Sequence, residues 1–177
     1  MTNILAQVFG VGAMISLFAA YQQKTAKRLT LSKLSADIFW IFHYFFLGAY
    51  TGIVPNAVGI ARELIFMNRK DKKWANSPIF PVLFVLIGWG VGLMTFRGPI
   101  SLLPLCASTV VTLGLWTQNQ LICKIACFPA SLCFLIYDIF VGSYIGIFAE
   151  SFSLVSLVIF FVKFGVARYR EKKKKEL

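Results

Sequence analysis

Two polar residues, Asn56 and Glu150, lie inside long apolar stretches of the sequence and are its strongest candidates for chemistry. A polar group at membrane depth is costly and is a functional hypothesis by default. The amide of Asn56 can donate and accept hydrogen bonds, which suits a neutral polar solute, whereas the carboxyl group of Glu150 can hold a proton, a cation or an amine. The alternatives are a hydrogen bond between helices for Asn56 and a hydrated position near the outer surface for Glu150.

An internal repeat relates these two residues. When the sequence is shifted by 94 positions, the segment 46–53 (FLGAYTGI) aligns with 140–147 (FVGSYIGI), Ala36 aligns with Ala130, and Asn56 aligns with Glu150. Repeats in two hydrophobic halves are typical of transporters, which bind their substrate between the halves. We therefore expect Asn56 and Glu150 to face one cavity from opposite halves. Pro55 precedes Asn56, lacks a backbone N–H, and is expected to act as a hinge.

Aromatic residues and the single histidine extend the candidate site. His43 shares a helix face with Trp40, three positions earlier, and Tyr137 occupies the position equivalent to His43 in the second repeat. His43 is interpreted equally well as a substrate ligand or proton relay and as a neutral side chain bonded to a nearby carbonyl. We place Trp40, His43 and Tyr137 with Asn56 and Glu150 in a substrate-binding set. Asp138 is expected at the outer entrance or hydrated beside it.

The remaining reactive side chains show no catalytic or metal-binding pattern. Cys123 and Cys127 are one helical turn apart, but neither a second cysteine pair nor a histidine accompanies them. The sequence also lacks a phosphate loop, a nucleophilic triad and a glycine-rich dinucleotide motif. We therefore expect no enzymatic activity, no metal and no cofactor.

The composition indicates an integral membrane protein. Hydrophobic residues make up 58% of the chain and charged residues only 14%, whereas about a quarter of the residues of a soluble domain are charged. The net charge of +11 comes from residues between and after the apolar stretches, so we expect contacts with anionic lipid headgroups at the basic loops and tail, and no nucleic acid. Arg62 is expected to extend to headgroups, and both Arg62 and Glu63 are expected to pair with a neighbouring charge and not to act in catalysis.

The basic residues also fix the number of spans. A span needs about 20 apolar residues, and basic loops collect on the cytoplasmic side. The clusters Lys24–Lys33 and Arg62–Lys73 must therefore lie on the same side, which requires a hairpin of two short helices between them. The result is an all-α protein with an outer N-terminus, a cytoplasmic C-terminus and seven helices, at residues 3–21, 33–49, 52–68, 77–95, 99–118, 124–141 and 144–166.

These helices divide into two parallel three-helix repeats joined by a linker helix. The first repeat covers residues 1–73, the linker helix 74–97 and the second repeat 98–167. A basic cytoplasmic tail follows at 168–177.

The segment Trp40 to Gly59 resembles the SWEET family, with its tryptophan, short outer turn and Pro-Asn-x-x-Gly sequence. Over nearly all of its length the chain resembles the YgjV family of bacterial inner-membrane proteins, which are similar to the SWEET and PQ-loop superfamily. This resemblance implies the bacterial inner membrane and places Asn56 at a substrate pocket. The first helix departs from the pattern, since Tyr21-Gln22 stands where PQ-loop proteins have Pro-Gln.

Two functional classes follow from these features. The first is a SWEET-like carrier that moves a small polar solute, such as a sugar, vitamin or metabolite, by alternating access. The second is a receptor or assembly factor that keeps the transporter fold without transport, for which the missing proline argues. Self-association into a homo-oligomer stays open as an alternative.

Overall fold

The protein is seen in a computed structural model that describes residues 4–69 and 71–175, without the side chains of residue 26 and of residues 167–175. All regular secondary structure in these residues is helical, which confirms the expected all-α protein with seven α-helices. The helices are α1 (Ile4–Gln22), α2 (Ala26–Leu47), α3 (Tyr50–Phe66), α4 (Ile79–Met94), α5 (Leu102–Trp116), α6 (Gln120–Val141) and α7 (Tyr144–Lys175). One-turn 3₁₀ helices precede α4 (η1, Lys73–Asn76) and α5 (η2, Pro99–Ser101).

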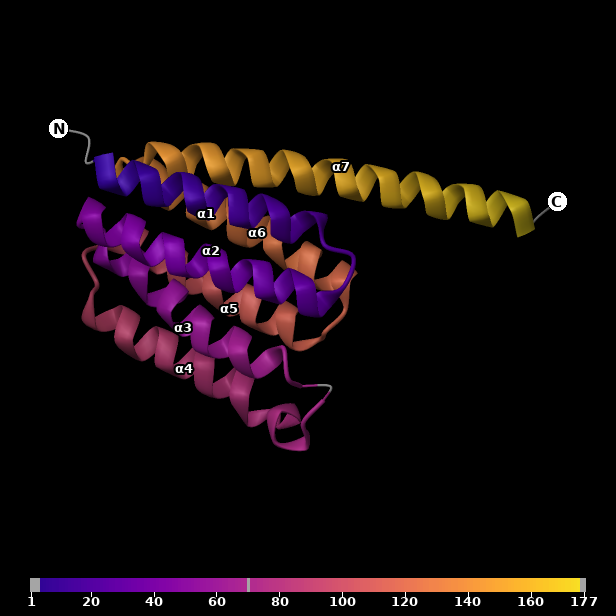
Figure 1. The fold of residues 1–177 in the computed structure, drawn as a ribbon, viewed down its shortest axis with the longest axis horizontal. Helices are drawn as coiled ribbons and strands as arrows, with labels where there is room; N and C mark the ends of the chain where they lie inside the picture. Colours follow the sequence, from indigo (N-terminus) through magenta and orange to yellow (C-terminus); the bar gives the residue numbers. More distant parts are fainter. Residues whose placement is uncertain (1–3, 70, 176–177) are drawn as a thin grey trace.

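Successive helices run in alternating directions, so α1, α3, α5 and α7 are parallel to one another (Figure 1). Among the described residues, four stretches are long and apolar enough to cross a membrane: Ile4–Gln22, Pro99–Trp116, Gln120–Val141 and Tyr144–Val166. Helix α4 is also apolar but shorter, and α2 and α3 carry charged residues. The chain is therefore a membrane protein with several spanning helices.

Helix α2 begins earlier than the sequence suggested. The expected start at residue 33 is wrong, because Thr25 caps the helix by accepting a hydrogen bond from the backbone N–H of Arg28. Lys27 and Arg28 therefore lie on the first turn of α2 instead of in a loop. At its other end, Gly48 adopts a left-handed conformation with a φ of 75°, a usual helix terminator.

The other boundaries differ mainly at the helix ends. The helix expected at 77–95 is α4, and the one expected at 99–118 begins as η2 and continues as α5. Helix α7 was expected to end at residue 166 but continues to Lys175, projecting past the bundle (Figure 1). Its last segment is rich in Arg, Glu and Lys, which favour helix outside the hydrocarbon core. The lipid contacts expected of the tail at 168–177 lie outside the described side chains.

The contacts between helices distinguish two groups, α1–α3 and α5–α7, which are called triplets below. Helix α2 packs between α1 and α3, and α6 packs between α5 and α7. The triplets meet where α1 contacts α7 and where α3 contacts α5, and α4 covers α3 and α5. The bounds of α2, shifted by 94 positions, coincide with those of α6, and the first residue of α3 coincides in the same way with that of α7.

Candidate functional site

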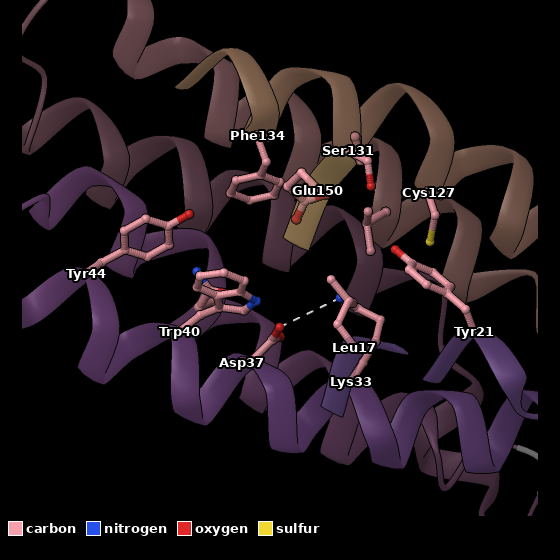
Figure 2. Close-up of a pocket in the computed structure, with 13 residues that line it drawn as sticks. Leu17, Tyr21, Lys33, Asp37, Trp40, Tyr44, Cys127, Ser131, Phe134 and Glu150 are labelled. Atoms are coloured by element: carbon pink, nitrogen blue, oxygen red, sulfur yellow. Dashed lines mark ion pairs between the residues drawn. The ribbon is translucent and has the colours of Figure 1, made fainter. Parts of the chain in front are cut away.

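A cavity lies between the two triplets, and side chains of α1, α2, α3, α5, α6 and α7 line it. It leaves about 40 Å³ for the centres of water molecules, enough for a few waters but too little for a sugar-sized solute. Figure 2 shows Glu150 and Ser131 on one side of this space and Trp40 and Asp37 on the other. The lining residues are Leu17, Tyr21, Lys33, Asp37, Trp40, Tyr44, Asn56, Val111, Cys127, Ala130, Ser131, Phe134 and Glu150.

Most of these residues occur as pairs that are 94 positions apart in the sequence. A shift of 94 positions, the same separation that joins Tyr44 to Asp138, connects five pairs within the lining. The pairs are Leu17 with Val111, Lys33 with Cys127, Asp37 with Ser131, Trp40 with Phe134, and Asn56 with Glu150. Residues separated by the same 94 positions therefore surround one space.

Asn56, Glu150 and Trp40, three of the residues expected to bind substrate, lie together in this cavity. All three are buried, with exposed fractions of 6%, 7% and 5%. The amide of Asn56 donates one hydrogen bond to the carbonyl oxygen of Gly52 at 2.7 Å, which leaves a second N–H on the same nitrogen. Pro55 is buried inside α3, and the helix continues past it.

His43 is not in the cavity lining. Its Nδ1 lies 2.7 Å from the carbonyl oxygen of Ala6, and its Nε2 lies 2.7 Å from the Ser143 hydroxyl. Because a carbonyl oxygen only accepts, Nδ1 carries the proton, and in a neutral ring Nε2 accepts from Ser143. The structure thus favours the interpretation of His43 as a side chain bonded to a nearby carbonyl. It joins α1 and α2 to the turn between α6 and α7.

Tyr137 is also outside the cavity. It lines a separate hollow near the turn between α2 and α3, together with Thr51 and Arg97. Its ring contacts that of Tyr44 at a centroid distance of 6.1 Å. Tyr137 therefore packs behind a cavity residue and does not line the cavity.

Tyr44 and Asp138 form a direct link between the two triplets. The Tyr44 hydroxyl donates to Oδ1 of Asp138 at 2.8 Å, and the two residues are 94 positions apart in the sequence. Asp138 is fully buried, which contradicts the hydrated position expected for it. Within the described residues its second oxygen has no hydrogen-bond partner. This bond joins α2 to α6 near the ends of both helices.

Four charged side chains form a buried cluster at the other end of the cavity. Arg62 contacts Glu63 at 3.3 Å and Asp37 at 4.0 Å, and Lys33 lies 3.7 Å from Asp37 and 3.9 Å from Glu63. Arg62 also donates to the Thr112 hydroxyl of α5 at 2.9 Å. The expectation that Arg62 reaches lipid headgroups is wrong, because its side chain is 3% exposed and pairs inside the bundle.

Gly59 allows this cluster to form. A Cβ atom on Gly59 would collide with the Asp37 carboxylate, so α2 and α3 approach closely at this point. The glycine of the Pro-Asn-x-x-Gly segment is thus explained by packing, because the absence of a side chain leaves room for the Asp37 carboxylate in the cavity wall.

Sequence reasoning missed Lys33, Asp37 and Tyr21 as cavity residues. A signal for two of them was present, because Lys33 and Asp37 are four positions apart and so share a helix face. Asp37 also aligns with the polar residue Ser131 when the sequence is shifted by 94 positions. Tyr21 had no such signal.

Comparison with known proteins places the chain among bacterial membrane proteins. The model of the Imp-YgjV family, described as a bacterial inner membrane protein, matches residues 4–168. The inner membrane protein YgjV of Escherichia coli strain K12 is 28% identical over 155 residues, which cover 86% of this chain and 80% of that protein. No solved structure matches the chain.

Proposed function

The chain belongs to the Imp-YgjV family of bacterial inner membrane proteins, and from this premise we propose that it is a carrier for a small polar solute. The observation that carries the proposal is the cavity lined by repeat-related pairs, with Asn56 on one half and Glu150 on the other. Substrate sites of transporters with internal repeats lie between the halves. The proposal assigns no catalytic step to the chain.

The proposed architecture is two parallel three-helix repeats joined by α4, as in SWEET proteins. Helices α1–α3 would form the first repeat and α5–α7 the second. The bond between Tyr44 and Asp138 supports this arrangement, because two equivalent residues can touch each other only at the axis that relates the two halves. The alternating helix directions support it as well, since α1 and α5 run the same way (Figure 1).

The contacts around the cavity suggest how it would open first to one side of the membrane and then to the other. At one end, the Tyr44–Asp138 bond closes the path between α2 and α6. At the other end, the cluster of Lys33, Arg62 and their carboxylate partners holds α2, α3 and α5 together. Each set joins helices that must separate to open that end. Because the cavity in this conformation is too small for a sugar-sized solute, binding would require one set to open, with Pro55 as the hinge in α3.

The orientation proposed for the chain puts the C-terminus in the cytoplasm and the N-terminus outside. Lys24, Lys73 and Lys124 lie at the end of the bundle where α1, α3 and α5 finish, and only Arg97 lies in the connection at the opposite end before α5. We expect a reporter that is active only in the cytoplasm to work when fused at the C-terminus or within residues 68–75. The same reporter should fail near Arg97, and activity there would contradict the seven-span topology.

A receptor or assembly factor that does not transport is the second candidate. The observation that favours it is the unbroken α1, which continues to Gln22 with Tyr21 in place of the proline. A helix without that proline lacks one feature that helps a PQ-loop protein to rock.

The accessibility of Cys127 separates the two candidates before any substrate is known. Cys127 lines the cavity and is 3% exposed. In a variant with the other three cysteines changed to serine, a carrier should react at Cys127 with a membrane-impermeant thiol reagent applied to either side of oriented vesicles. Reaction from one side only would favour the receptor, and reaction from neither side, with normal labelling after denaturation, would contradict a cavity that opens.

A further inference from the structure

A second and larger cavity lies on the outside of the bundle, in a groove between α1, α6 and α7. It leaves about 460 Å³ for the centres of water molecules, compared with about 40 Å³ in the cavity between the triplets. Its apolar wall includes Phe18, Phe152, Val155 and Ile159, which are 43–56% exposed and face the surroundings of the bundle. Its polar end is at the proposed cytoplasmic side, where α1 finishes and α6 begins.

Three lysines, Lys24, Lys124 and Lys163, line the same groove. Lys124 is only 4% exposed, and its ammonium nitrogen lies 3.7 Å from the centre of the Phe160 ring. In the part of the chain that the structure describes, none of the three lysines has a carboxylate within ion-pair distance. Burying a cation without an anionic partner is costly. The groove therefore has a positive end that an external anion would neutralise.

The counterpart of this interface under the shift of 94 positions lies between α3 and α5, where side chains bridge the two helices. Between α3 and α5, Arg62 bonds to Thr112, Gln118 donates to the carbonyl oxygen of Phe66, and Arg69 stacks on the Trp116 ring at 3.8 Å. Helix α4 also packs over this interface.

The substitutions between the halves explain the difference. Shifted by 94 positions, Arg62 corresponds to Ser156, and Gln118 to Lys24. On the α1–α7 side these contacts are therefore replaced by a small hydroxyl and a free amine. Side-chain contacts bridge the α3–α5 interface, whereas the α1–α7 interface is open and basic.

We propose that this groove binds one anionic phospholipid, with the headgroup phosphate at Lys24, Lys124 and Lys163 and an acyl chain along the phenylalanine and aliphatic wall. The apolar wall opens toward the bilayer, so a lipid fits both ends of the groove, whereas a soluble anion would leave the wall uncovered. Basic pockets between helices at the cytoplasmic side are a known setting for such lipids. The site is independent of any transported solute.

Native mass spectrometry of the full-length protein in detergent tests the proposal, with phosphatidylglycerol and phosphatidylcholine of identical acyl chains as the probes. We expect the protein to bind phosphatidylglycerol in preference to phosphatidylcholine. In the double variant Lys24→Gln/Lys163→Gln the affinity for phosphatidylglycerol should fall on the order of thirtyfold, since each basic residue near an anionic headgroup contributes about fivefold. Both lysines are exposed, so their replacement should not disturb folding.

Two further variants distinguish lipid binding in the groove from unspecific attraction of anionic lipid to basic residues. The control Lys72→Gln/Lys73→Gln removes the same charge from an exposed segment outside the groove and should bind as the wild type does. Ser156→Phe keeps every charge but fills the groove, and should reduce binding as the lysine changes do. Equal affinity for the two lipids, equal loss in the control, or full binding by Ser156→Phe would each overturn the proposal.

Discussion

Replacing Arg62 with methionine should lower the free energy of unfolding by about 3–5 kcal/mol, the usual cost of removing one partner from a buried ion pair. The change leaves the carboxylates of Asp37 and Glu63 with Lys33 as the only cation of the cluster. It also removes the donor of the hydrogen bond to Thr112, which ties α3 to α5. Thermal or denaturant unfolding of the purified protein in detergent measures the effect.

The exposed pair between Lys27 and Asp71 supplies the matched control. Its atoms are 3.0 Å apart, closer than those of the Arg62 pairs, but its side chains are 61% and 57% exposed. Lys27→Met should therefore cost less than about 1 kcal/mol. If Arg62→Met does not fold, the double variant Arg62→Met/Glu63→Gln should restore folding by removing the unpaired charge. A cost for Arg62→Met as small as that of Lys27→Met would contradict a buried, structurally important cluster.

Asn56→Ala and Glu150→Gln should each weaken solute binding by about tenfold to a hundredfold while leaving the protein folded and inserted. The loss of one hydrogen-bonding partner in a desolvated pocket costs on the order of 1–3 kcal/mol, and both side chains are buried at the cavity. The measurement is the concentration dependence of solute uptake in proteoliposomes, compared with wild type.

Asn68 and Asp71 provide the corresponding controls. The amide of Asn68 donates to the carbonyl oxygen four residues earlier at 2.8 Å, the same contact that Asn56 makes at 2.7 Å, but Asn68 is outside the cavity. Asn68→Ala and Asp71→Asn should therefore leave uptake unchanged. Equal losses in these controls would show that the effects of Asn56→Ala and Glu150→Gln are unrelated to the cavity.

That Asn56 and Glu150 line one cavity was predictable, because a constant shift visible in the sequence aligns the two positions. The number of helices was predictable for a similar reason, since it follows from apolar length and from the placement of basic residues. Both predictions can be made without knowing which side chains contact each other. The proposed grouping of the helices into repeats depends on the same shift.

The positions of Arg62 and His43 could not be predicted in this way. Each depends on partners far away in the sequence: Thr112 for Arg62, and Ala6 and Ser143 for His43. The start of α2 was missed because counting apolar residues finds only the part of a helix inside the membrane core. The helix itself begins earlier, after the N-cap residue Thr25. Lys33 was counted with the basic loop although it is the first residue of the expected helix, so its place in the cavity wall was missed.

Solute uptake by proteoliposomes tests the central claim, that this chain is a carrier, most directly. The purified wild-type protein is reconstituted and offered labelled sugars, nucleosides and vitamins. We predict that at least one of these solutes enters faster than into protein-free liposomes, with a saturable rate that Glu150→Gln reduces. Entry of every solute at the protein-free rate, by protein shown to be folded and inserted, would contradict the carrier and favour a protein that does not transport.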